Sequence, residues 1–244
     1  MESSSHIEQT LYFGVCPHDL LNQLELWFAF AAQLSRLCGV SLRFEPSLDF
    51  PEFSRQLANY HLVYANPNDT LTLVRMHGYI PLARFEESFD EGVLVVRAGE
   101  NRVLAEVNQW RVATCTSLVV NDIVLRHLAK EGYMPKEMLD FPSWSAALSA
   151  LVHGESDAAI LYADFFNQLR SETKARLDVL AASNERLAFH SFCLAPALSN
   201  LEPVLRQALV ALSHDPVGRD VLRDLGRQAI VRTVVEEIEA FDRL

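Results

Sequence analysis

One phrase occurs twice in this sequence. The first copy reads Phe-Pro-Glu-Phe-Ser from Phe50 and leads to Leu-Val-Tyr-Ala-Asn at residues 62–66; the second reads Phe-Pro-Ser-Trp-Ser from Phe141 and leads to Ile-Leu-Tyr-Ala-Asp at residues 160–164. Each copy has the pattern of a short helix followed by a buried strand that ends in a tyrosine and a small polar residue. Two such units predict two lobes of similar build, whose Tyr-x-Asn and Tyr-x-Asp strand ends face one another across a cleft.

The composition is that of a protein with a full apolar core. Half of the 244 residues are apolar, and no apolar run approaches the ~20 residues that a bilayer-spanning helix needs, so we expect no membrane span. A net charge of -11 and the lack of a basic stripe argue against a nucleic-acid partner. The same charge gives no long-range attraction to an anion, so local donors would have to hold any anionic ligand.

The N-terminus and the cysteines bear on the compartment. Residues 1–10 are polar and carry neither the basic nor the apolar region of a secretion signal. As the chain stands we expect a cytoplasmic protein, whereas removal of a leader would make it periplasmic. The four cysteines are scattered in apolar contexts without CxxC spacing, which is typical of core thiols in a reducing compartment; they are Cys16, Cys38, Cys115 and Cys193.

Strands and helices alternate along the first third of the chain. Apolar periodicity predicts strands at 11–16, 40–44 and 62–65 and helices at 20–37, 50–59 and 70–77. Asp49 is expected to cap the second helix, with Pro51 in its tolerated first turn. This alternation favours an α/β fold with a doubly wound parallel sheet that binds ligands at the carboxyl ends of its strands.

The rest of the chain predicts a second lobe and a return to the first. Two extended stretches, 79–84 and 92–97, flank an acidic loop at 86–91, where we expect the chain to cross between lobes. The further predicted elements are helices at 103–107, 118–130, 144–152, 201–213 and 217–225, strands at 111–114, 138–141, 177–181 and 189–194, and a helical segment at 231–241. Lobe 1 would comprise residues 1–84 and 185–244 and lobe 2 residues 85–184, joined by two hinge strands with a ligand cleft between them.

Three features together resemble the type 2 periplasmic binding protein fold. They are Phe13-Gly14-Val15 with Pro17, Asp49 ahead of the first repeat helix, and residues 154–159 (Gly-Glu-Ser-Asp-Ala-Ala) before a buried strand. The chain is most similar to the PhnD-like phosphonate-, phosphite- and phosphate-binding proteins of ABC transporters, over roughly residues 11–225. The resemblance implies a solute-binding protein that closes on a small polar ligand by hinge motion. It also implies a phosphonate or another oxyanion as a candidate ligand and an ABC permease as a candidate partner.

The resemblance also implies the positions of the ligand-binding residues. Thr114, Thr116 and Ser117 match the hydroxyl-rich loop at a helix N-terminus, a place that favours negative charge. The remaining candidates lie at strand ends, just past the first strand, after the two repeat strands and on the returning strand; they are His18, Tyr64, Asn66, Tyr162, Asp164 and His190.

The sequence departs from the family pattern where the anion would bind. The usual Ser-Thr-Ser-Gly loop is shortened, because Thr116-Ser117 leads directly into Leu-Val-Val. Acidic residues at 87, 90 and 91, and Asp164 after the second repeat strand, only accept hydrogen bonds when ionised. A cationic, zwitterionic or neutral polar ligand is therefore an alternative to phosphonate.

Simpler interpretations stand beside these assignments. The two repeat tyrosines can be ordinary strand residues, and Asn66, Asp164, Thr116 and Ser117 can be helix N-caps. Cys16 and His18 lie two residues apart without a third ligand nearby in sequence, so we expect no metal site. No catalytic or cofactor-binding motif is present, and no cofactor or catalytic residue is expected. A cytoplasmic enzyme or a ligand sensor on the same fold is the alternative to a binding protein.

Overall fold

The computed structural model describes residues 10–20, 23–47, 49–116 and 118–243. The chain forms two compact units, each with its own sheet. Unit 1 comprises Met1–Ser88 and Phe189–Phe241, and unit 2 comprises Phe89–Ala188 with Asp242–Leu244. The architecture is therefore a two-lobed α/β fold with two mixed sheets.

The sheet of unit 1 has six strands. Their order is β11 (Ile230–Arg232), β4 (Ile80–Phe85), β10 (Ser191–Leu194), β3 (Leu62–Ala65), β1 (Leu11–Val15) and β2 (Leu42–Phe44). β1 runs parallel to β2 and β3, while β10 runs antiparallel to β3 and β4. Because Ser191 pairs with Ala65, β10 begins at the edge where β1 and β3 end.

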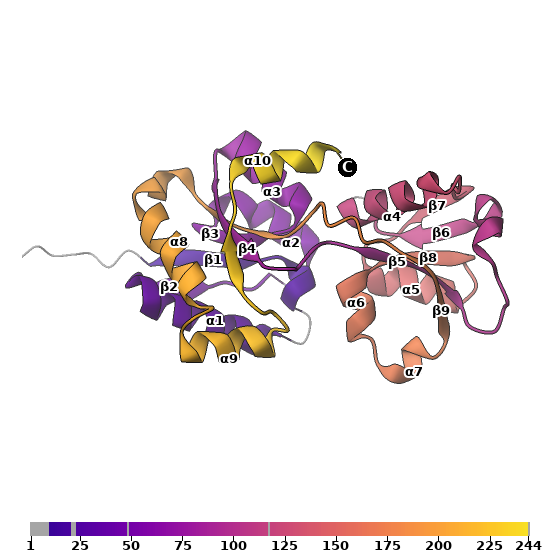
Figure 1. Cartoon of the computed structure of the whole chain (residues 1–244), viewed down its shortest axis with the longest axis horizontal. Coiled ribbons are helices and arrows are strands. Elements are labelled where there is room, and N and C mark those ends of the chain that lie inside the picture. Colours follow the sequence, from indigo (N-terminus) through magenta and orange to yellow (C-terminus); the bar gives the residue numbers. More distant parts are fainter. Residues whose placement is uncertain (1–9, 21–22, 48, 117, 244) are drawn as a thin grey trace, which may run out of the picture. The chain divides into compact units, whose positions relative to one another are not determined.

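Helices cover both faces of this sheet. Figure 1 shows α1 (Leu24–Cys38) and α9 (Pro216–Asp224) on one side and α2 (Phe50–Gln56) and α3 (Pro67–His77) on the other. The helix α8 (Glu202–Ala211) packs into the same apolar core as α1. In this core Phe30 of α1 stacks on Phe192, with ring centroids 5.4 Å apart. The helix α10 (Val235–Glu239) packs against α3, and short 3-10 turns lie at Pro17–Leu20, Leu57–Asn59, Pro196–Leu201 and Ala240–Arg243.

The sheet of unit 2 has five strands. Their order is β7 (Glu137–Asp140), β6 (Arg111–Thr114), β8 (Ala158–Tyr162), β5 (Gly92–Arg97) and β9 (Leu177–Ala182). β6 runs parallel to β7 and β8, and β5 runs antiparallel to β8 and β9. The helices α4 (Val119–Lys130) and α5 (Trp144–Val152) cover opposite faces (Figure 1). A 3-10 turn at Leu104–Gln109 precedes β6, and two short helices that the sequence analysis did not predict, α6 (Ala163–Gln168) and α7 (Ser171–Lys174), follow β8.

The repeated phrase marks a larger structural repeat. In both copies a capped helix leads into a buried strand, α2 into β3 and α5 into β8, as predicted. The Asp49 carboxylate accepts the Glu52 N–H (2.7 Å), and the Ser143 hydroxyl accepts the Ala146 N–H (3.1 Å). The parallel triad β2-β1-β3 matches β7-β6-β8 in strand order, and in each unit an antiparallel strand follows the third member, β10 in one and β5 in the other. Cys16 after β1 therefore corresponds to Cys115 after β6.

Several predicted elements differ in the structure. The helix expected at 20–37 begins at Leu24, and the one expected at 103–107 is the 3-10 turn Leu104–Gln109. The helix expected from residue 70 begins at Pro67, because Asn66 caps it and proline suits the first turn. The helical segment expected over 231–241 was wrong at its start. Residues Ile230–Arg232 instead form β11, which pairs with the edge of β4, and helix α10 begins only at Val235.

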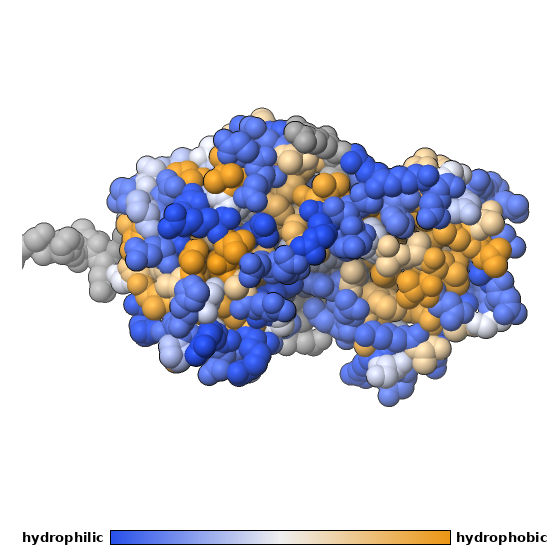
Figure 2. Space-filling model, in the orientation of Figure 1, coloured by the Kyte–Doolittle hydropathy of each residue, from blue (hydrophilic) through white to orange (hydrophobic). Residues whose placement is uncertain are grey.

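Apolar areas lie over both units on the face shown in Figure 2. The one on unit 2 lies over the part that holds β5 and β9 in Figure 1. β9 is an edge strand, and Val179 on it is 46% exposed. Among the described residues no helix is long and apolar enough to cross a membrane.

Candidate functional site

Polar side chains gather at the strand-end edge of unit 1. Cys16 follows β1, and its N–H donates to the Tyr64 carbonyl at the end of β3 (2.8 Å). Nδ1 of His18 lies 3.8 Å from Sγ of Cys16, and Nδ2 of Asn66 donates to the same sulfur at 3.6 Å. The ring of His190, one residue before β10, lies 6.1 Å from that of His18. Three of the predicted binding residues, His18, Asn66 and His190, therefore meet around one thiol.

A buried carboxylate connects this group to a cation. Oδ2 of Asp19 lies 3.4 Å from Nε2 of His190, and Nη2 of Arg227 donates to Oδ1 of Asp19 at 3.3 Å. Arg227 also donates to the Ser88 hydroxyl (2.6 Å), and its guanidinium lies over the ring of Phe85. The edge therefore holds a charge-paired network in which Asp19 separates the imidazole from the guanidinium.

Tyr64 occupies a different place from the one expected of a ligand contact. Its side chain is 1% exposed, and its ring centroid lies 4.6 Å from Phe192, 5.1 Å from Phe85 and 5.3 Å from Trp27. The ring also lies 5.3 Å from His190. Tyr64 thus belongs to the aromatic core and supports His190 from within the unit, while a ligand contact by Tyr64 stays a prediction.

Burial sets the ionisation of the acidic groups around Cys16. Burial raises the pKa of the Cys16 thiol, and a hydrogen bond with His190 opposes the rise. Burial also raises the pKa of Asp69, against the donation of Nδ2 of Asn66 to that carboxylate at 2.6 Å. The thiol is therefore neutral near pH 7 unless a cation replaces its proton.

The matching edge of unit 2 holds threonines and acids. The side chain of Thr114, at the end of β6, is fully buried, and its hydroxyl has no hydrogen-bond partner within the part of the chain that the structure describes. Both the N–H and the hydroxyl of Thr116 donate to Oδ1 of Asp140, at 2.9 and 2.7 Å. These bonds hold the pKa of Asp140 below its usual range. Ser117, the third residue of the predicted anion loop, lies outside the described residues.

Tyr162 and Asp164 form a contact of their own at the end of β8. The buried Tyr162 hydroxyl donates to Oδ2 of the partly buried Asp164 at 3.5 Å. The cap expected at Asp164 was wrong, because α6 begins one residue earlier and Tyr162 takes the N-cap position. The cap expected at Asn66 is confirmed, since its side chain accepts the Asp69 N–H at 3.0 Å.

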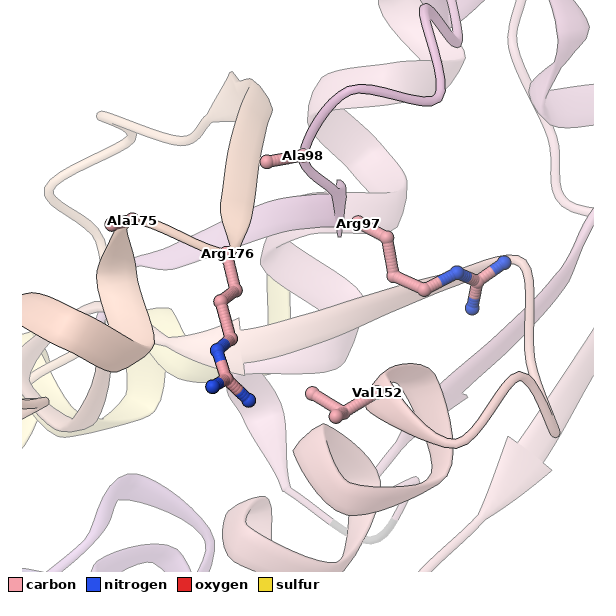
Figure 3. Close-up of a pocket in the computed structure, with 5 residues that line it drawn as sticks. All are labelled: Arg97, Ala98, Val152, Ala175 and Arg176. Carbon is pink, nitrogen blue, oxygen red and sulfur yellow. The ribbon is translucent and has the colours of Figure 1, made fainter.

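A separate pocket lies at the opposite edge of the unit 2 sheet. It is open, has a volume of about 400 Å³ and is lined by Arg97, Ala98, Val152, Ala175 and Arg176. The two guanidinium groups stand apart (Figure 3), and Arg97 donates to the carbonyls of Leu151 and Ser156. Because Arg97 pairs with Leu177 at the beginning of β9, this pocket is remote from Thr114 and Tyr162 at the strand ends.

Three charged residues of these edges escaped the sequence analysis. Asp19 and Arg227 lie 208 residues apart in the sequence and meet only where the segment after α9 contacts the turn after β1, and nothing in their local sequence predicts that pair. Asp140 is the last residue of β7, so a search for polar residues at strand ends that included strand-final residues would have found it.

Comparison with known proteins identifies the fold and a family. Residues 13–237 match the family model described as ABC transporter, phosphonate, periplasmic substrate-binding protein. No curated protein matches the sequence. PhnD1 of Prochlorococcus marinus, solved with methylphosphonate, is 14% identical with a TM-score of 0.80 over 97% of each chain.

Two further solved structures share the fold. A binding protein component of a Pseudomonas aeruginosa ABC phosphonate transporter is 14% identical, with a TM-score of 0.76 over 95% of this chain and 83% of that one. A histidine kinase sensor domain with similarity to periplasmic binding proteins is 15% identical, with a TM-score of 0.65 over 91% and 98% of the two chains. At such identities the similarity is one of fold.

Proposed function

Because the chain belongs to the periplasmic substrate-binding proteins of phosphonate ABC transporters, we propose that it binds a small ligand of the phosphonate type for an ABC permease. The ligand would contact side chains at the carboxyl ends of the parallel strands, the edge at which α/β sheets bind ligands. The observation that supports this best is that both sheets gather polar side chains at that edge, His18, Asn66 and His190 in one unit and Thr114 and Thr116 in the other.

The acids at the same edges favour a ligand that also carries a positive charge. Asp140 already accepts both donors of Thr116, and Asp164 accepts the Tyr162 hydroxyl. Ionised carboxylates cannot donate to a phosphonate oxygen, but they bind an ammonium group well. A zwitterionic aminoalkylphosphonate satisfies both kinds of group, with its phosphonate on donors and its ammonium on a carboxylate.

Calorimetric titration tests this proposal. We expect saturable binding of 2-aminoethylphosphonate with one site per chain, and binding of methylphosphonate about tenfold weaker, since one charge-assisted contact is lost. Asp164→Asn should remove most of the preference for the amino compound by weakening its binding alone. Glu172→Gln on α7, an exposed acid of the same unit, should leave both affinities unchanged.

Two results would contradict the proposal. Failure of both phosphonates to bind at millimolar concentration would remove the ligand class. Binding of both with equal affinity in the wild-type chain, unchanged by Asp164→Asn, would remove the role of the carboxylate and leave only a simple phosphonate.

A further inference from the structure

Three metal-ligating side chains meet at the strand-end edge of unit 1. Among the described residues, only Cys16, His18 and His190 form such a group, with one ligand atom of each lying within 4.8 Å of the other two. The closest pair whose atoms are identified is Sγ of Cys16 and Nδ1 of His18, 3.8 Å apart. Ligand atoms on one tetrahedral zinc ion lie roughly 3.3–3.6 Å apart, so small side-chain shifts would bring all three onto an ion.

The fold explains why residues so distant in sequence converge. Cys16-Pro17-His18 leaves β1 directly into a 3-10 turn, which places two ligands two residues apart on the same side of the chain. The third ligand arrives with β10, which pairs with β3 next to β1 and begins at the edge where they end. Both segments belong to unit 1, so the group is complete within one unit.

From this geometry we propose that unit 1 binds one zinc-class transition-metal ion through Sγ of Cys16 and the imidazoles of His18 and His190. A thiolate with two imidazoles is a donor set that prefers zinc or copper(I) and discriminates against magnesium and calcium, which prefer oxygen. Three protein ligands leave a fourth tetrahedral position open. The proposal goes beyond phosphonate binding and does not depend on it.

The surroundings are those of a metal site rather than of a plain core thiol. The Asp19 carboxylate lies against Nε2 of His190, and a carboxylate beside a coordinating imidazole orients the ring and increases its basicity. Nδ2 of Asn66 donates to Sγ, which would stabilise a thiolate. Cys16 and His190 are buried, whereas His18 is partly exposed and lies edge-on to Phe50 with centroids 4.5 Å apart. An ion would therefore enter past His18.

A cobalt(II) titration of the chelator-treated full chain, without phosphonate, tests the site. We expect one equivalent to give a thiolate-to-cobalt charge-transfer band together with tetrahedral visible absorption, and zinc to displace it. Cys16→Ser should abolish the charge-transfer band, and His18→Gln should weaken zinc binding at least tenfold. The matched control is Cys115→Ser, at the corresponding position after β6, which should bind as the wild type does.

The outcomes separate cleanly. No thiolate band in the wild-type chain, or the same band in Cys16→Ser, would overturn the proposal. Should Cys16→Ser fail to fold, the wild-type spectrum and His18→Gln decide the matter, because His18 is partly exposed and its replacement removes a ligand without opening the core. Zinc binding that His18→Gln leaves unchanged would also exclude the site. Phosphonate titration of the metal-free wild-type chain tests the proposed function separately, and Cys16→Ser, which changes none of the side chains proposed to contact the phosphonate, distinguishes loss of metal binding from loss of phosphonate binding.

Discussion

The pKa of Asp140 is lowered mainly by Thr116, which donates both its hydroxyl and its N–H to one carboxylate oxygen, and further by a backbone hydrogen bond from Phe141. A carboxylate whose pKa is lower in the folded than in the unfolded chain contributes stability above the unfolded pKa of about 3.9. That stability is lost as the pH falls through the folded pKa. We expect Thr116→Val to raise the pKa of Asp140 toward its usual value, measured by NMR titration of the side-chain carboxyl carbon.

The control for this change is Thr173→Val on α7, remote from Asp140 in sequence and outside its hydrogen bonds. An unchanged Asp140 titration in Thr116→Val would mean that the hydroxyl is not the donor that lowers the pKa. A shift in both variants would point to a general effect on unit 2 instead of the contact.

Position 14 of β1 requires glycine because the ring of Tyr60 packs directly against it. A Cβ atom at this position would lie 2.6 Å from Cδ2 of the buried Tyr60 ring, which is closer than non-bonded carbon atoms approach one another. We expect Gly14→Ala to lower the free energy of unfolding by about 1–3 kcal/mol through overpacking, measured by urea denaturation. Tyr60→Leu in the same chain should recover part of the loss, because the two changes share one contact. Gly14→Ala at wild-type stability would contradict the packing described here.

At this scale the sequence predicted positions better than partners. His18 and Asn66 could be proposed because each follows a predicted strand, and His190 because it lies on the predicted returning strand; the structure brings the three to one edge. The pair of Asp19 and Arg227 could not, since the two residues lie near opposite ends of the chain and meet only after folding. Tyr64 looked like a cleft residue by its place in the repeat, yet the same place is a core position.

At the scale of elements, both repeat helices begin with a side-chain N-cap, but the capping groups differ. Asp49 caps α2 with a carboxylate and Ser143 caps α5 with a hydroxyl. We expect Asp49→Ala and Ser143→Ala each to reduce the free energy of unfolding by about 1 kcal/mol. The exchanges Asp49→Ser and Ser143→Asp should reduce the free energy of unfolding by only about a few tenths of a kcal/mol, because serine and aspartate both accept hydrogen bonds from the same N–H groups.

Chemical denaturation followed by far-ultraviolet circular dichroism checks all four variants. Equal losses in the alanine and exchange variants would show that the side-chain caps do not stabilise these helices. Losses confined to one unit would show that the repeat is one of sequence and not of energetics.

Periodicity predicted the long helices and also short buried strands such as β3 and β6, but it missed β11, α6 and α7. Helices such as α1 and α4 have sustained apolar spacing, and their bounds came within a few residues. The strand β11 has three residues and is defined by its pairing with β4, which a local pattern does not record. The same holds for α6 and α7, which are held by the loop between β8 and β9.

At the scale of the whole molecule, the sequence repeat is part of a larger repeat of strands in the two sheets. The triads β2-β1-β3 and β7-β6-β8 share their order, their direction and the antiparallel strand that follows. The sequence repeat is visible only in the second helix and third strand of each triad, because both helices begin with a side-chain cap and both strands are fully buried. What the repeat cannot encode is the chemistry of each edge. One edge has a thiol and two imidazoles, and the other has threonines and acids.

The most direct test of the account is a map of where a phosphonate binds. Backbone amide chemical shifts recorded during titration with 2-aminoethylphosphonate should change most at the residues that follow β1, β3, β6 and β8, around His18, Asn66, Thr116 and Asp164. The amides around Arg97 and Arg176, at the opposite edge of the unit 2 sheet, should remain still. Shifts confined to that pocket, or no saturable shifts at all, would contradict the claim that the strand-end edges bind a phosphonate.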